Sequence, residues 1–163
     1  MSGVMELNPK KQPKEIILQE SDILKEFAIE IIDKEMLDLK GARVKYLMAY
    51  PYISKKCAGK CVKSTRELKY FSEADYIIEI SNDLWNVLNE EMRYIVMLNQ
   101  LLKICPVTND KTGEVNYKVI DHDFKGFAKI IKKYGGMDWY YRIREINSSL
   151  YDLSPSEAEG FIL

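Results

Sequence analysis

The chain has 163 residues, a formal net charge of −1, 47% hydrophobic residues and 30% charged residues. This balance is ordinary for one folded domain, and the near-zero net charge gives no general attraction to nucleic acid or to an anionic membrane. No apolar run approaches the roughly 18 residues of a membrane span, and residues 1–13 contain no apolar signal-peptide core. Three cysteines cannot all pair within one chain, which favours free thiols in a reducing compartment. Composition therefore predicts a cytoplasmic protein without a membrane partner.

The first half of the chain predicts one helix and two strands. Residues 1–20 contain two prolines and a lysine cluster, so we expect a flexible N-terminal arm. Ser21 can cap a helix that reaches about residue 37, before Gly41 ends it. An alternating segment and then a short apolar run predict two strands, with a basic loop or hairpin edge between them. In chain order these three segments are 42–50, 54–63 and 75–81.

The second half predicts further helices around a polar hairpin. A wide apolar face marks a central helix that begins after Asn89 and runs to Ile104. A helical turn (82–88) precedes this helix. A hairpin (107–120) and two later helices (124–134 and 139–146) follow it. The whole reads as an α+β chain with a small, mostly antiparallel sheet and about four helices. We expect a single domain over residues 21–150 and a polar tail over residues 151–163.

Three polar residues near the end of the central helix have the spacing of a zinc motif. Asn99 and Lys103 are four residues apart, so a helix projects both side chains from one face, and Gln100 follows Asn99. In the zinc-binding pattern H-E-x-x-H, two histidines occupy this spacing and a glutamate follows the first. The sequence therefore keeps the spacing of the motif without its chemistry.

The order of elements from Ala42 to Trp139 resembles the putative phage metallopeptidase family. The matching pieces are, in order, a strand (76–80), a turn with a tryptophan (85) and the start of the central helix (89–93). A segment after the hairpin (121–124) and the end of the closing helix (133–135) follow. The resemblance implies a zincin-like core. It places the first histidine of the motif at Asn99, the glutamate at Gln100, the second histidine at Lys103 and the third ligand at His122, the chain's only histidine.

These substitutions predict a degenerate site with no catalytic residue. An amide at position 99 is a weak zinc ligand, an ammonium at position 103 offers no lone pair, and an amide at position 100 cannot act as a general base. We therefore expect a pseudoenzyme without a cofactor. One hypothesis places the Lys103 ammonium where the metal stood, bonded to Asn99 and His122; the alternative is a solvated lysine near a helix C-terminus.

Two other groups of residues leave alternative functions open. Cys57, Cys61, Cys105 and His122 have the ligand types of a relocated zinc site, although two loop thiols and a buried thiol at a helix end, without a metal, explain the cysteines more simply. A basic segment could contact nucleic acid, although such segments are usually solvated surface. It comprises Lys55, Lys56, Lys60, Lys63, Arg66 and Lys69.

A scaffold that folds but has lost its chemistry is expected to act through its surface. The resemblance implies a phage or prophage origin, and hence a place in the cytoplasm of the host cell. We therefore expect a protein that binds a host protein of unknown identity, for example as an anti-defence or anti-CRISPR inhibitor. The alternatives are a metalloprotein or peptidase that uses the Cys/His site, and a nucleic-acid-binding module that uses the 55–69 segment.

Overall fold

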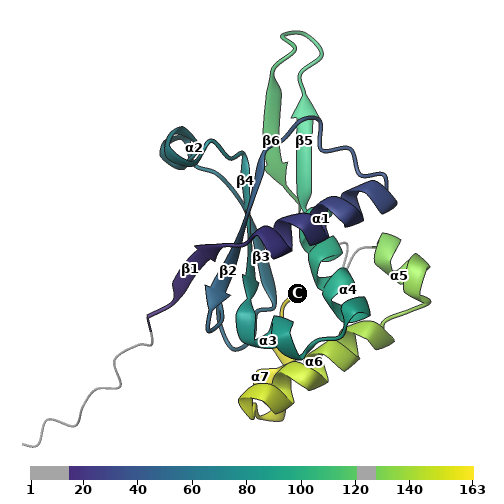
Figure 1. The fold of residues 1–163 in the computed structure, drawn as a ribbon. Coiled ribbons are helices and arrows are strands. Elements are labelled where there is room, and N and C mark those ends of the chain that lie inside the picture. The colour runs from purple at the N-terminus through teal and green to yellow at the C-terminus, as the bar shows by residue number, and fades with distance from the viewer. Residues whose placement is uncertain (1–14, 121–127) are drawn as a thin grey trace, which may run out of the picture.

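A computed structural model describes residues 15–120 and 128–163. Its larger sheet has four strands in the order β1-β2-β4-β3 (Figure 1). Strands β2 and β4 are parallel, and the other two pairs are antiparallel. The bounds are β1 Ile17–Glu20, β2 Val44–Tyr50, β3 Gly59–Lys63 and β4 Tyr76–Ser81. The sheet is thus mixed but mostly antiparallel, and the α+β prediction is confirmed.

Strand β1 corrects the expected N-terminal arm. Within the predicted arm 1–20, residues Ile17–Glu20 pair with β2 and form one edge of the sheet. Ile17 and Leu18 remain 61% and 48% exposed, so pairing with β2, rather than burial of side chains, holds this strand in place. The lysines and prolines that suggested an arm lie before it, outside the described residues.

Helices cover the face of the sheet on which one row of matched residues from β2, β4 and β3 is buried. Tyr46, Ile78 and Cys61 are matched across β2, β4 and β3, and all three are buried. Helices α1 (Asp22–Lys34) and α4 (Glu90–Leu101) pack against this layer and against each other. Ser21 caps α1 by accepting a hydrogen bond from Leu24 N, as the sequence predicts.

The remaining elements frame this core. Helix α2 (Arg66–Ser72) buries no residue and was not expected from the sequence, whereas α3 (Asn82–Val87) was. Strands β5 (Ile104–Thr108) and β6 (Val115–Val119) form the predicted hairpin as a separate two-stranded sheet. The later helices are α5 (Ala128–Tyr134), α6 (Asp138–Tyr151) and α7 (Pro155–Glu159). No helix of the described ranges combines the length and apolarity that crossing a bilayer requires.

The tail corrects a second expectation. Residues 151–163 were predicted as a polar tail, but Phe161 and Leu163 are 4% and 1% exposed and belong to the core. Tyr140 of α6 donates a hydrogen bond to the Phe161 carbonyl at 2.9 Å. The last residues therefore complete the fold instead of leaving it.

Candidate functional site

The last turn of α4 carries the two amides that the sequence singled out. Asn89 begins the helix by accepting a hydrogen bond from Met92 N at 2.9 Å, and the helix ends at Leu101. Asn99 and Gln100 are both fully buried, with no exposed surface. Two polar side chains in the interior at the end of a helix require buried partners, because an unpaired buried amide is destabilising.

Lys103 supplies one of these partners, although it lies outside the helix. The predicted helix to Ile104 was too long: α4 ends at Leu101, Lys103 lies in the following turn, and Ile104 begins β5. The Lys103 side chain nevertheless turns inward, and the residue is only 8% exposed. Its Nζ atom donates to Gln100 Oε1 at 2.9 Å. A buried lysine excludes the alternative of a solvated residue.

The same ammonium contacts the last residue of the chain. Lys103 Nζ donates to the main-chain oxygen of Leu163 at 3.1 Å, across 60 residues of sequence. Asn99 and Lys103 have further polar interactions, and His122, the third expected position, lies outside the described residues. The structure thus brings Gln100 and Lys103 together, with Asn99 beside Gln100 on the last turn of α4.

Gly59 fits against this group because it lacks a side chain. A Cβ atom at Gly59 would lie 2.7 Å from Gln100 Nε2, closer than such atoms approach. Gly59 begins β3, so Gln100 packs against the edge strand of the larger sheet. The close packing explains a glycine inside the basic segment that the sequence alone did not account for.

Cys57 and Cys61 lie close enough to the Lys103 ammonium to be influenced by its charge. All three cysteines are unpaired with one another, and Cys57 donates a hydrogen bond to the Gly59 carbonyl. Burial raises the pKa of Cys61 to about 12 and also raises that of Cys57, while the Lys103 charge partly opposes both shifts. Within residues 15–120 and 128–163, no three metal-ligating side chains form a group that could hold an ion. Cys105 lies half-buried on β5.

The residues of the basic segment differ in exposure and in their partners. Lys60 and Lys63 are exposed on β3, and Arg66 is exposed on α2. Lys69 instead forms an ion pair with buried Asp75 at 2.9 Å. Burial opposes ionisation of Asp75, but hydrogen bonds and charge from neighbouring groups outweigh it and lower the pKa of this carboxyl. Lys55 is exposed, and Lys56 is half-buried.

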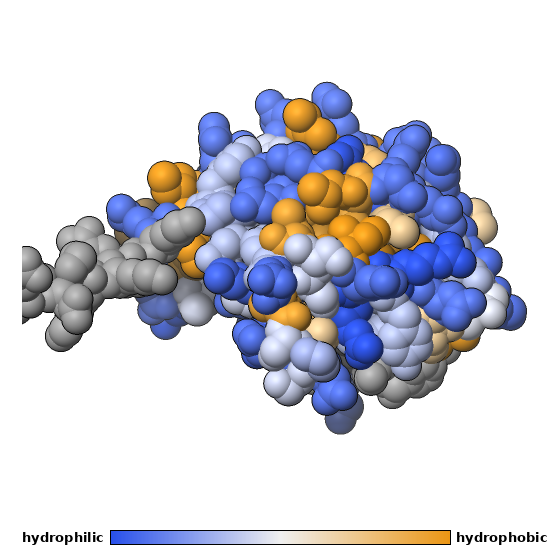
Figure 2. All heavy atoms as spheres, turned by 90° about the horizontal axis from the view of Figure 1, so that it is seen from below, coloured by the Kyte–Doolittle hydropathy of each residue, from blue (hydrophilic) through white to orange (hydrophobic). Residues whose placement is uncertain are grey.

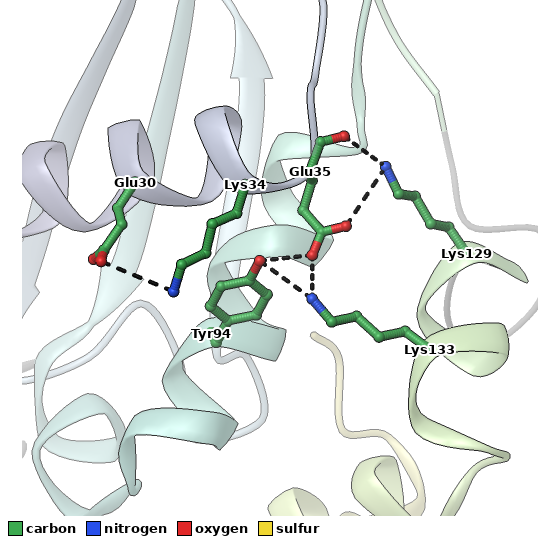
Figure 3. Close-up of polar contacts among 6 residues, drawn as sticks. All are labelled: Glu30, Lys34, Glu35, Tyr94, Lys129 and Lys133. Atoms are coloured by element: carbon green, nitrogen blue, oxygen red, sulfur yellow. Dashed lines mark hydrogen bonds and ion pairs between the residues drawn. The ribbon is translucent and has the colours of Figure 1, made fainter.

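A polar cluster that sequence reasoning missed joins α1, α4 and α5 (Figure 3). Tyr94 of α4 donates to Glu35 Oε1 at 2.6 Å, and Lys133 contacts both groups. Lys129 Nζ donates to the Glu35 carbonyl at 3.2 Å and lies 3.8 Å from its carboxylate. Burial opposes ionisation of Glu35, but Lys133, Tyr94 and Lys129 lower its pKa overall. The cluster holds α5 against the end of α1. Its members are about 60 to 100 residues apart in the sequence, so no local pattern predicts that they meet.

An apolar groove lies between α6 and the α3–α4 corner. Its volume is about 620 Å³, and it is lined by Val87, Met92, Arg142, Glu145, Ile146, Ser149 and Leu150. Figure 2 shows apolar side chains gathered on the face seen from below. Val87 and Leu150 are 49% and 37% exposed. Contiguous exposed apolar surface commonly marks an interaction site.

Together the fold and the site define an α+β protein in which a buried amide and a buried ammonium meet at the end of a core helix. The chain belongs to the family described as putative phage metallopeptidase, whose model matches residues 17–149. No curated protein and no solved structure matches the chain. The expected family is confirmed, and the family assignment rests on most of the domain.

The donor set at Asn99, Gln100 and Lys103 does not fit the zinc ion that the family name implies. An ammonium that donates to Gln100 Oε1 has no lone pair for a metal, and its charge would repel the ion. Gln100 cannot take a proton from a water molecule, because an amide is not a base near neutral pH. These three residues therefore supply neither a zinc ligand set nor a general base.

Proposed function

We propose that this chain is a non-catalytic phage or prophage protein that acts by binding a protein of its host. The observation that carries the proposal is the buried contact between Lys103 and Gln100 at 2.9 Å. A lysine side chain is rarely buried without a specific partner. Lys103 occupies a position that the family resemblance assigns to a zinc ligand. A side chain that donates a hydrogen bond as an ammonium cannot also bind zinc.

The surface supports a protein ligand better than a small charged one. The groove between α6 and the α3–α4 corner is lined by the exposed apolar residues Val87 and Leu150 and by the charged residues Arg142 and Glu145. An apolar centre with a mixed polar rim is typical of protein interfaces. Within the phage setting, an inhibitor of a host defence system, such as an anti-CRISPR protein, is the class of activity we propose for it.

Capture experiments with surface variants test this function. The tagged full chain is incubated with host lysate, and each captured protein is then purified and its binding measured directly by calorimetry. We expect one host protein to bind, and the double variant Val87→Asp/Leu150→Asp to weaken that binding at least about tenfold, since burying unpaired carboxylates opposes association.

A matched control separates the groove from general surface chemistry. Ile23 and Ile29 on α1 are 72% and 53% exposed, so the double variant Ile23→Asp/Ile29→Asp adds the same two charges at apolar surface positions elsewhere. This variant should bind the captured protein as the parent does. Equal loss of binding in both variants, or a captured ligand that is nucleic acid, would contradict the proposal.

A further inference from the structure

The residues that follow α7 pair with the segment just before β3 through one parallel β-bridge at Ile162. Ile162 N donates to the Lys56 carbonyl at 2.7 Å, and Ala58 N donates to the Ile162 carbonyl at 2.9 Å. Cys57 and Ile162 form a parallel bridge directly before β3. Figure 1 marks this end of the chain with C, beside β3 and α4. The segment 160–163 is therefore seated by backbone pairing, the mode by which sheets accept extended peptides.

The side chains of this segment alternate in the way that a bound peptide does. Phe161 and Leu163 are buried at 4% and 1% exposure, while Ile162 between them is 55% exposed. The two inward residues fill apolar space, and Lys103 donates to the Leu163 main-chain oxygen at 3.1 Å. Tyr140 does the same for Phe161 at 2.9 Å. The seat thus has two apolar pockets and two side-chain donors aimed at the peptide backbone.

The connection to the rest of the fold is concentrated in the last three residues. Helix α7 has five residues and buries none of them, so the stretch from Pro155 onward is attached through the pairing of Ile162 and the buried side chains of Phe161 and Leu163. Elements with few buried contacts open at lower free energy than the core. Gln100 Nε2, under the segment, has no hydrogen-bond partner among the residues that the structure describes.

We propose that this seat is a peptide-binding site, and that residues 160–163 are its intramolecular ligand. The site takes an extended peptide that presents two apolar side chains separated by one outward residue, and it reads the peptide backbone through Lys103 and Tyr140. Release of the segment opens the site to such a peptide from another polypeptide. This inference rests on the proposed function only in taking a polypeptide as the ligand, and it concerns a surface distinct from the α6 groove.

A binding measurement with a synthetic peptide tests the site. The probe is a fluorescent, amidated peptide with the sequence of residues 157–163, and the full chain carries Phe161→Ser and Leu163→Ser to release its own segment. The released variant should bind the probe at least about tenfold more tightly than the parent, because the attached segment competes at high effective concentration. A probe with serine at both inward positions should not bind.

Two further variants make the result specific. Ile162→Ser changes the outward residue alone, so it should leave the segment seated and the probe excluded. Lys103→Met in the released background should weaken probe binding about tenfold, because one hydrogen bond from a charged donor is lost. A folded released variant that fails to bind the probe overturns the proposal, whatever the host-capture experiment shows.

Hydrogen exchange of the parent protein tests the same proposal if the released variant does not fold. The amides of Ala58 and Ile162 should exchange at least about tenfold faster than the slowest amides of β4, because the segment opens while the sheet stays intact. Equal protection would mean that the segment leaves only when the whole protein unfolds, and would overturn the proposal. Loss of host-protein binding with normal peptide binding would instead count only against the proposed function.

Discussion

The Nζ atom of Lys103 lies 2.9 Å from Oε1 of Gln100, in the interior and beside the edge strand of the sheet. The sequence suggested that Lys103 would face the same way as Asn99 on one helix, but the helix ends two residues before the lysine. The turn that follows α4 brings the side chain back into the core, so the polar group forms by a different route from the one that helical spacing predicts.

Replacing Lys103 by alanine should destabilise the fold. The variant loses a buried side chain and leaves Gln100 Oε1 without its ammonium donor, so we expect the free energy of unfolding to fall by about 2–4 kcal/mol. Urea unfolding followed by circular dichroism measures this. Lys25→Ala, at an exposed position of α1, is the matched control and should change stability by less than about 0.5 kcal/mol. Similar effects in both variants would contradict the account.

Gly59→Ala should expose the close packing between β3 and α4. The new Cβ atom would lie 2.7 Å from Gln100 Nε2, and we expect a loss of about 1–3 kcal/mol from overpacking. Adding Gln100→Ala removes the clash, so the double variant should be more stable than the sum of the two single effects predicts, by more than about 0.5 kcal/mol. Additive effects would show that these residues do not contact each other as the structure places them.

Acid should destabilise the protein through Glu35 and Asp75. Both carboxyls have folded-state pKa values lowered from their ordinary values of 4.5 and 3.8. A lowered pKa means that the stabilisation is fully present above the unfolded-state value and is lost as the pH falls through the folded-state value. Unfolding free energies measured between pH 7 and pH 3 should therefore drop below about pH 4.5.

The variant Glu35→Gln should reduce the acid dependence without removing it. Asp75 remains and still interacts with Lys69 and Arg43. The difference in unfolding free energy between parent and variant should be greatest at neutral pH and should shrink on acidification, because Glu35 contributes only when ionised. A difference that stays constant from pH 7 to pH 3 would contradict the assignment of this cluster.

Local patterns predicted most of the elements, and long-range contacts explain most of what they missed. Strand β2 has an alternating sequence, β4 is a short run of mostly apolar residues, and Ser21 and Asn89 are recognisable caps, so these elements followed from neighbouring residues. The start of β1 gains its structure from pairing with β2, which no local pattern reveals. Helix α2 buries no residue and therefore shows no amphipathic stripe to detect.

The candidate site was predictable in its residues but not in its contacts. Asn99, Gln100 and Lys103 stood out because their spacing matches a zinc motif, and the structure buries all three. The contact with Leu163 spans 60 residues and joins the site to a segment whose composition suggested a polar tail. Two buried apolar residues among many polar ones carry too weak a pattern to predict that packing.

Zinc binding to the purified full chain tests the central claim most directly. The metal-free protein is titrated with zinc by calorimetry, and bound zinc is then measured by elemental analysis after gel filtration. We predict no stoichiometric zinc in the parent protein, because the Lys103 ammonium and two amides occupy the expected ligand positions. About one equivalent of zinc that is lost on Asn99→Ala would contradict the account, and zinc lost on Cys57→Ser or Cys61→Ser would replace it with a metalloprotein that uses the cysteines.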